Sequence, residues 1–143
     1  TYTEGGTNTN DRRGIDVDTG QYNTFLGCFV SDSDGSGICV GNHQGGVWNT
    51  FIGCHVKDAD GFGFYLDAQG VKLLGCTVQN SGEASRYHLT ADADNFVAVA
   101  NTLNAGNFAM ASGADNGLMV GNLLDGTTSN SGSGNEVVGN KGF

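Results

Sequence analysis

The sequence contains no proline and one tryptophan, and it is poor in residues that favour helices. A chain with 25 glycines and no proline makes its turns with Gly, Asn, Asp and Ser. Ala, Leu, Glu and Lys are scarce at helical spacing, which argues against a helical bundle. The 38% hydrophobic content argues against disorder. At 143 residues, the sequence predicts one all-β domain with many tight turns.

Positive charge is also scarce, because 6 Lys and Arg face 15 Asp and Glu, for a net charge of -9. Nucleic acids and anionic membrane surfaces attract basic residues, so we expect no nucleic-acid partner and no membrane partner. No apolar run approaches the roughly 18 residues of a membrane span. The sequence starts at Thr1 rather than Met, and we expect a fragment of a longer chain. Sugars remain open as ligands, since Asp, Asn and aromatic groups often bind them.

What the sequence does contain is a repeat with a period of 21 to 26 residues. Each unit opens with alternating apolar residues, the pattern of a strand buried on one face. These openings are residues 14–17, 37–40, 63–66, 86–89 and 107–110. A second strand follows in each unit, at residues 25–30, 51–56, 73–78, 98–103 and 119–124. A solenoid of stacked coils explains why the same residue type returns at the same phase.

The repeat predicts an all-β, right-handed parallel β-helix of about five to six coils, stacked about 4.8 Å apart. We assign residues 1–143 to one domain, with a lead-in at 1–13 and regular coils at 14–126. Residues 127–143 then form an irregular turn and a last partial coil. In the second strand we place one apolar column outward: Phe25, Phe51, Leu73, Ala98, Met119 and Val137. So long an exposed stripe would need a loop, a third sheet or neighbouring chains to cover it.

Another column of the second strand holds small polar groups: Cys28, Cys54, Cys76, Asn101, Asn122 and Asn140. We predict that it faces inward, with the Asn side chains hydrogen-bonded along the stack. Free Cys packs as a small hydrophobe, so we favour reduced thiols, although adjacent rungs would also permit a disulfide. A single line of ligands does not suit zinc. Cys39 is predicted to point outward and to be the reactive thiol.

Gly37-Ile38-x-Val40 followed by residues 49–54, and Val-Gly-Asn at 120–122 and 138–140, resemble the pectate-lyase-type parallel β-helix repeat. That superfamily includes polysaccharide lyases, glycoside hydrolases, sugar epimerases and phage tailspikes. The Gly- and Asn-rich turns without proline resemble the tailspike or prophage branch most. The resemblance implies a homotrimer, outside the cell or on a virion surface, that binds and often cleaves a surface polysaccharide. It covers residues 14–143 and is specific for fold rather than activity, because Asn42-His43-Gln44 is not the His motif of polygalacturonases or alginate epimerases.

The first strands carry the candidate catalytic residues. If Ile15 and Val17 point inward, Asp16 and Asp18 point outward, about 7 Å apart. The same face would then present Asp67 and His88 on later rungs. Two carboxylates roughly 6.5 to 9.5 Å apart suit an inverting glycosidase, one as acid and one as base. A lyase would instead use His88 as its base.

The candidates for substrate binding are Tyr65 on the same face, Arg86 at its edge and Trp48 at a coil corner. Arg86 would neutralise a uronate, while Trp48 would stack on a sugar ring. The competing interpretation is that all these residues are solvated groups on an exposed sheet, with Trp48 as half-buried packing.

Two turns, at residues 31–35 and 57–61, are rich in Asp and Gly. Stacked coils would bring Asp32 near Asp58 and Asp34 near Asp60, and calcium could bridge such carboxylates. Asp34, Asp58 and Asp60 are therefore weak calcium candidates, and ordinary turn chemistry is the alternative. We expect no other cofactor.

Two functions remain open. The first is a carbohydrate-binding module of a tailspike-like protein, with polysaccharide as partner and with or without a hydrolase or lyase site. The second is a non-catalytic shaft that assembles with itself as a homotrimer. A free-standing secreted enzyme fits less well, because five coils span only about 25 Å.

Overall fold

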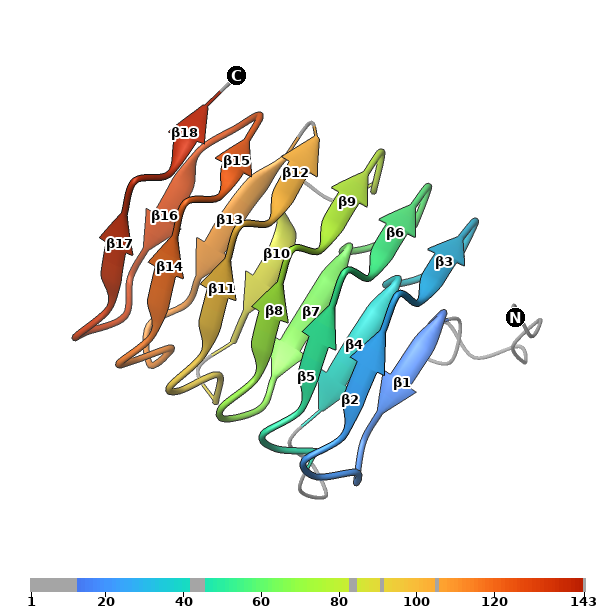
Figure 1. Cartoon of the computed structure of the whole chain (residues 1–143), viewed down its shortest axis with the longest axis horizontal. Coiled ribbons are helices and arrows are strands. Elements are labelled where there is room, and N and C mark those ends of the chain that lie inside the picture. The colour runs from blue at the N-terminus through green and yellow to red at the C-terminus, as the bar shows by residue number, and fades with distance from the viewer. Residues whose placement is uncertain (1–12, 42–45, 83–84, 91, 105, 143) are drawn as a thin grey trace.

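The computed structural model is a parallel β-solenoid of about five turns, with three faces (Figure 1). It describes residues 13–41, 46–82, 85–90, 92–104 and 106–142, with the backbone alone at 85–87. Within each coil the chain passes through sheet A, then sheet B, then sheet C, and enters the next coil. The predicted parallel β-helix architecture is confirmed, and every strand pairs with its equivalent one coil away.

Each sheet has six strands. Sheet A comprises β1 (Ile15–Val17), β4 (Ile38–Gly41), β7 (Phe64–Asp67), β10 (Ser85–Leu89), β13 (Asn107–Met110) and β16 (Thr128–Asn130). Sheet B comprises β2 (Thr24–Leu26), β5 (Thr50–Ile52), β8 (Lys72–Leu74), β11 (Val97–Val99), β14 (Leu118–Val120) and β17 (Glu136–Val138). Sheet C comprises β3 (Phe29–Ser31), β6 (His55–Lys57), β9 (Thr77–Gln79), β12 (Thr102–Asn104), β15 (Leu123–Leu124) and β18 (Lys141–Gly142).

The register of sheet A matches the repeat in the sequence. Ile15 pairs with Ile38, Ile38 with Phe64, and Phe64 with Tyr87. The stack also continues through the segment expected to be irregular, because Thr128 pairs with Phe108 in sheet A. β17 and β18 extend the other two sheets in the same way.

The segment predicted as one second strand is in fact two strands, one in sheet B and one in sheet C. Between them lies a residue with a φ of 54° to 62°. These residues are Gly27, Gly53, Gly75, Ala100, Gly121 and Gly139. A left-handed residue interrupts the alternation of a strand, so Phe51 and Cys54, three positions apart, both point inward.

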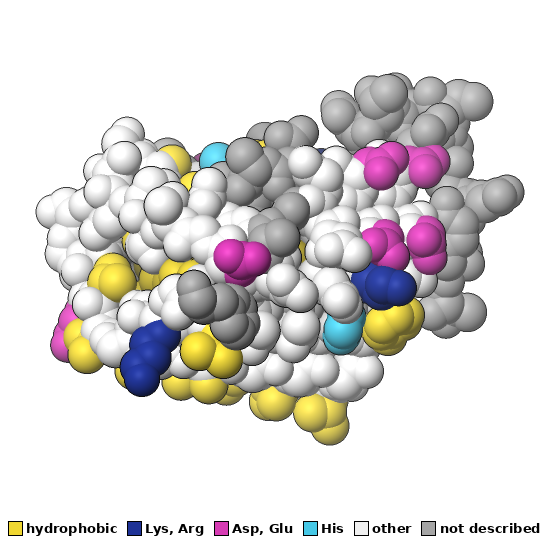
Figure 2. Space-filling model, turned by 90° about the horizontal axis from the view of Figure 1, so that it is seen from above, with side chains coloured by type: hydrophobic (Ala, Val, Ile, Leu, Met, Phe, Trp, Pro, Cys, Tyr) yellow, Lys and Arg dark blue, Asp and Glu magenta, His cyan; other side chains and the backbone are white. Residues whose placement is uncertain are grey.

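This turn makes the predicted outward column wrong. Its members in the middle coils form part of the core: Phe51, Leu73, Ala98 and Met119, each at most 1% exposed. Phe25 packs against the core, and Val137 is exposed in the last coil. The column that faces outward is the neighbouring one: Leu26, Ile52, Leu74, Val99, Val120 and Val138. Figure 2 shows hydrophobic side chains projecting along the lower edge of the molecule.

The core is a stack of apolar rungs. Phe25 and Phe51 stack with ring centroids 4.7 Å apart, and Phe51 meets Phe64 edge-on at 5.9 Å. Successive coils bury equivalent residues on top of one another, so each coil depends on its neighbours for burial.

The column of small polar residues is an internal ladder, as predicted. Asn101 Nδ2 donates to Asn122 Oδ1 at 2.9 Å, and Asn122 Nδ2 donates to Asn140 Oδ1 at 2.8 Å. The cysteines are free, and the thiols of Cys54 and Cys76 donate to backbone carbonyls of the preceding coil. Burial raises the pKa of Cys76 to about 12.

Candidate functional site

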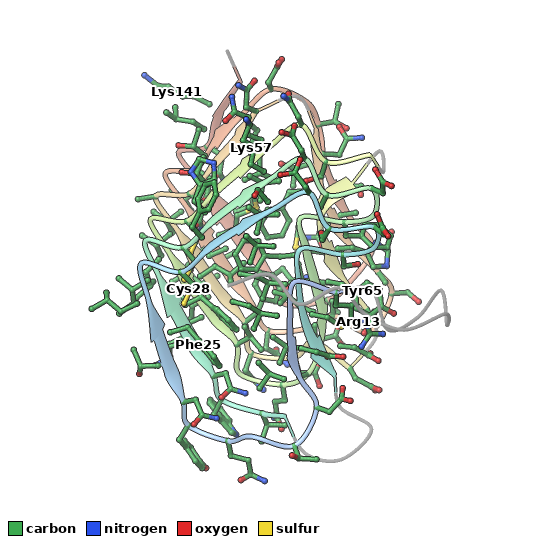
Figure 3. All side chains as sticks on the ribbon, turned by 90° about the vertical axis from the view of Figure 1, so that its right-hand side faces the viewer. Arg13, Phe25, Cys28, Lys57, Tyr65 and Lys141 are labelled. Carbon is green, nitrogen blue, oxygen red and sulfur yellow. The ribbon has the colours of Figure 1, made fainter. Side chains whose placement is uncertain are left out.

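The outer face of sheet A brings together most of the residues singled out in the sequence. Asp16, Cys39, Tyr65 and His88 lie on four successive rungs, in direct register. Figure 3 places Tyr65 on the same side of the solenoid as Arg13, away from Cys28 and Phe25. The strand alternation that buries Ile38, Phe64 and Leu66 turns these side chains away from the core.

Three aromatic rings cluster at the centre of this face. The imidazole of His88 stacks on Phe62, with centroids 4.7 Å apart and planes 26° apart. Tyr65 lies beside both, 5.6 Å from His88 and 5.5 Å from Phe62. Phe62 comes from the turn that precedes β7. The sequence reasoning missed it, although an aromatic residue just before a strand opening was the available signal.

Burial sets the protonation of the cluster. Burial lowers the pKa of His88, and the negative charge of Asp67 acts in the opposite direction by raising it. Burial also raises the pKa of Tyr65, and the charge of Asp67 adds to that effect. Both groups are therefore held neutral near pH 7: the imidazole can accept or donate one hydrogen bond, and the phenol keeps its proton.

Asp16 lies at one end of the face, in an ion pair with Arg13 at 2.8 Å. Burial raises the pKa of Asp16, while Arg13 opposes the rise through its hydrogen bond and its charge. Arg13 fell in the expected lead-in and was missed, although it precedes Asp16 by three residues. The pair places a charged donor and a charged acceptor at this end of the face.

Asp18 and Asp67 flank the face on its other edge. Asp18 lies across Gly41, where an added Cβ would come within 2.8 Å of the Asp18 carboxylate, so the glycine makes room for it. Asp67 accepts a hydrogen bond from the hydroxyl of Thr90. Asp18 and Asp67 are two rungs apart, or about 10 Å between Cα atoms, and Asp16 and Asp18 are about 7 Å apart on one strand. These are backbone spacings, and the carboxyl group of Asp18 lies close enough to that of Asp16 to contribute to the rise in its pKa.

Cys39 was predicted to point outward and to be the reactive thiol, and the prediction of reactivity is wrong. Its position does face away from the core, but the side chain is 1% exposed. Burial raises the pKa of Cys39 to about 12, and the carboxylates around it contribute in the same direction. A thiol so rarely ionised is a poor nucleophile, so Cys39 serves as a spacer between Asp16 and Tyr65.

One further candidate, Trp48, does not join the face, and another, Arg86, has a side chain that the structure does not describe. Trp48 lies at the corner between sheets A and B, where its side chain is 37% exposed. Arg86 lies at a register shift of β10, between Ser85 and Tyr87, and its side chain is outside the described part of the structure. Residues 42–44 are also outside the described residues.

The Asp-rich turns stack as expected, because the backbone N–H of Asp60 donates to Ser33 in the adjacent coil at 2.8 Å. Asp32 and Asp58 both adopt a positive φ, which Asp tolerates in turns. Asp58 forms an ion pair with Lys57 at 3.3 Å. Figure 2 shows most of the acidic side chains of the face it draws gathered on the right. Within the described ranges, no group of three or more His, Cys, Asp or Glu residues is placed to hold a metal ion.

No family model, curated protein or solved structure matches this chain. The part of the chain that the structure describes contains no helix long and apolar enough to cross a membrane. The fold and this face together define the class of protein, which is a parallel β-solenoid with an aromatic cluster flanked by carboxylates on one outer sheet.

Proposed function

We propose that the chain is a carbohydrate-binding module that holds a surface polysaccharide against the outer face of sheet A. The parent protein would be tailspike-like, of the pectate-lyase-type superfamily, and exposed outside the cell or on a virion. The observation that carries the proposal is the cluster of Phe62, Tyr65 and His88 beside Asp67.

The chemistry of the face suits a sugar. Aromatic rings provide a flat apolar surface with polar edges, which matches the apolar face and hydroxyl rim of a pyranose. Asp18 and Asp67 offer carboxylate acceptors for those hydroxyls, and Arg13 offers a donor at the far end. A sheet whose rungs repeat every 4.8 Å or so presents these groups in a line, as an extended ligand requires.

Cleavage of the bound chain is the extension of this proposal. In a hydrolase, Asp16 would act as the acid, because burial raises the pKa of its carboxyl group, and Asp18 would act as the base through water. In a lyase, the neutral imidazole of His88 would remove the proton beside a uronate. Either reaction would need the substrate to lie across the first three rungs of sheet A.

The test is a binding screen on immobilised bacterial capsular and O-antigen polysaccharides, followed by titration of any hit. Tyr65→Ala, Asp18→Ala and Asp67→Ala should each weaken binding at least tenfold, about 1.4 kcal/mol, without changing the melting temperature by more than a few degrees. Thr102→Ala, on the outer side of sheet C, is the matched control. Full affinity in all three variants would refute the proposal. Assays for reducing ends and for unsaturated products would then separate hydrolase, lyase and pure binding.

A second function, a self-assembling shaft, is favoured by the outward apolar column of sheet B. Leu26 is 74% exposed, Ile52 36% and Val138 46%, with Phe29 at 58% on the adjoining sheet C. Monomers seldom expose so continuous a stripe, and a homotrimer would cover it. Light scattering after size exclusion should give three times the chain mass, reduced by Leu26→Ser with Ile52→Ser. A wild-type monomer at micromolar concentration would count against this function.

Calcium stays a proposed ligand of the turns that carry Asp34, Asp58 and Asp60. Bound calcium would raise the melting temperature, and a chelator would remove that gain. A melting temperature indifferent to both additions would eliminate the site.

A further inference from the structure

The corner between sheets A and B contains a column of six residues that all have a positive φ. They are Tyr22, Trp48, Gly70, Asn95, Asn116 and Gly134, with φ between 54° and 71°. The backbone N–H of each of the first five donates to a carbonyl of the next coil, such as Tyr22 to Val47 and Trp48 to Gln69. The fold therefore imposes the left-handed conformation on whichever residue occupies this position.

The residue types in this column divide into two groups. The later coils use Gly and Asn, which adopt a positive φ at little cost. The first two coils use Tyr22 and Trp48, and for bulky residues this conformation is a genuine outlier. Burial does not compensate Tyr22, whose side chain is 73% exposed. Trp48 lies across Gly70, where an added Cβ would be 2.3 Å from its ring, and still leaves 37% of its surface exposed. Such strain is retained most often at ligand sites.

The corner that carries the two aromatic residues is firmly built. Asn49 is fully buried, and its side chain donates to Gly20 O at 2.7 Å and to Gly46 O at 3.0 Å. Its Oδ1 accepts from the backbone and the side chain of Asn23, at 2.9 and 3.1 Å. These bonds hold the residues beside Tyr22 and Trp48 in place before any ligand arrives, which lowers the entropy cost of binding.

We propose that Tyr22 and Trp48 form a platform that binds a neutral, pyranose-based glycan along the axis of the solenoid. The two residues occupy equivalent positions on adjacent rungs, so they are about 4.8 Å apart along that axis. Three exposed amide side chains lie beside them and can donate to and accept from hydroxyls: Gln21 and Asn23, which flank Tyr22 in the sequence, and Gln69, whose backbone carbonyl accepts from the N–H of Trp48. Because these neighbours carry no charge, the corner favours a neutral glycan over a uronate. This site is separate from the face of sheet A and does not depend on it.

Trp48 is the only tryptophan in the chain, so its fluorescence reports on this corner. The experiment titrates the full chain with cellohexaose, maltohexaose and chitohexaose, and with hexagalacturonate as the anionic counterpart. At least one neutral hexasaccharide should shift the emission to shorter wavelength with a saturable curve. Tyr22→Asn should weaken that affinity at least tenfold. The melting temperature of Tyr22→Asn should stay the same or rise, because Asn is what the fold uses at the same position in other coils.

Two controls locate the signal. Asn116→Gly changes the same column far from the platform and should leave the titration unchanged. Tyr65→Ala disrupts the face of sheet A and should also leave the Trp48 signal intact. The proposal is overturned if no neutral hexasaccharide shifts the emission, if hexagalacturonate alone does so, or if Tyr22→Asn binds as well as wild type. It is equally overturned if Tyr65→Ala, but not Tyr22→Asn, abolishes the shift.

Discussion

Asn101 and Asn122 are 21 residues apart in the sequence, yet the side-chain oxygen of Asn122 accepts two hydrogen bonds from Asn101. Oδ1 of Asn122 accepts from the backbone N–H of Asn101 at 2.8 Å and from its Nδ2 at 2.9 Å. Both side chains are fully buried, and Nδ2 of Asn122 donates in turn to Ala98 O. The ladder thus satisfies the backbone N–H groups of Cys76, Asn101 and Asn122, which the turns between sheets B and C would otherwise leave without partners.

Removing one rung of this ladder should be costly. Asn122→Ala leaves the N–H groups of Asn101 buried without an acceptor, and we expect a loss of roughly 2 to 4 kcal/mol in the free energy of unfolding. Urea denaturation followed by circular dichroism measures it. Asn104→Ala, at an exposed position in β12, is the control and should change stability by less than about 0.5 kcal/mol. Equal effects of the two substitutions would show that the ladder contributes nothing special.

Phe51 and Ile52 test which side of sheet B faces the core. Phe51→Ala removes a ring that stacks on Phe25 and meets Phe64, and should cost about 3 to 5 kcal/mol. Ile52→Ala removes a side chain that is 36% exposed and should cost less than about 1.5 kcal/mol. Thermal and urea denaturation of the two variants give the comparison. The reverse order would mean that the original prediction for this strand was correct.

Gly75 and Ala100 occupy equivalent turns, with φ of 61° and 54°. A Cβ at Gly75 would meet nothing within 4 Å, so a substitution there would destabilise the fold only through the positive φ. Gly75→Ala should therefore lower the free energy of unfolding by about 1 to 2 kcal/mol, and Ala100→Gly should raise it by up to about 1 kcal/mol. Calorimetric melting measures both. Destabilisation by Ala100→Gly would contradict the strain assigned to this turn.

Cys28 and Cys39 should differ in reactivity, in the opposite order to the prediction from sequence. Cys28 is partly exposed, whereas Cys39 is buried with a pKa of about 12, which leaves less than about one thiol in ten thousand ionised at pH 7.5. Iodoacetamide labelling of the native chain, mapped by mass spectrometry, should modify Cys28 first. In Cys28→Ser, the remaining thiols should react only after unfolding. The prediction is contradicted if Cys39 is labelled in the native chain as fast as Cys28.

His88 should make stability depend on pH in a defined direction. Its pKa is lowered from 6.5 in the folded chain, so its contribution to stability is complete above pH 6.5 and declines as the pH falls towards the folded value. Between pH 8 and pH 5, the wild type should therefore lose more stability, or gain less, than His88→Gln. The difference between the two melting curves isolates this residue from the carboxylates.

The same residue offers a direct titration by NMR. Asp67→Asn removes the charge that opposes the shift, so it should lower the pKa of His88 further, while keeping an acceptor for Thr90. Asp32→Asn, in a turn at another corner of the coil, should leave it unchanged. A His88 pKa that rises in Asp67→Asn would contradict the arrangement described for this face.

The sequence by itself determined the solenoid, its period and most of its columns. An apolar residue that recurs at the same phase, as in Val30, Val56 and Val78, has one economical explanation, since a single coil cannot enclose a core. The same logic correctly predicted the ladder that contains Asn101 and Asn122, and the rung order of Asp16, Tyr65 and His88.

The tertiary structure alone decided which side of each strand faces inward after a turn, and what covers each outward residue. One left-handed residue at Gly53 turns Ile52 out and Phe51 in, because a single positive φ reverses the alternation on which a linear pattern depends. Burial of Cys39, stacking of Phe62 on His88 and strain at Tyr22 likewise arise between residues on different coils or from the path of a corner. Alternation describes one strand at a time, whereas these properties depend on how neighbouring coils meet.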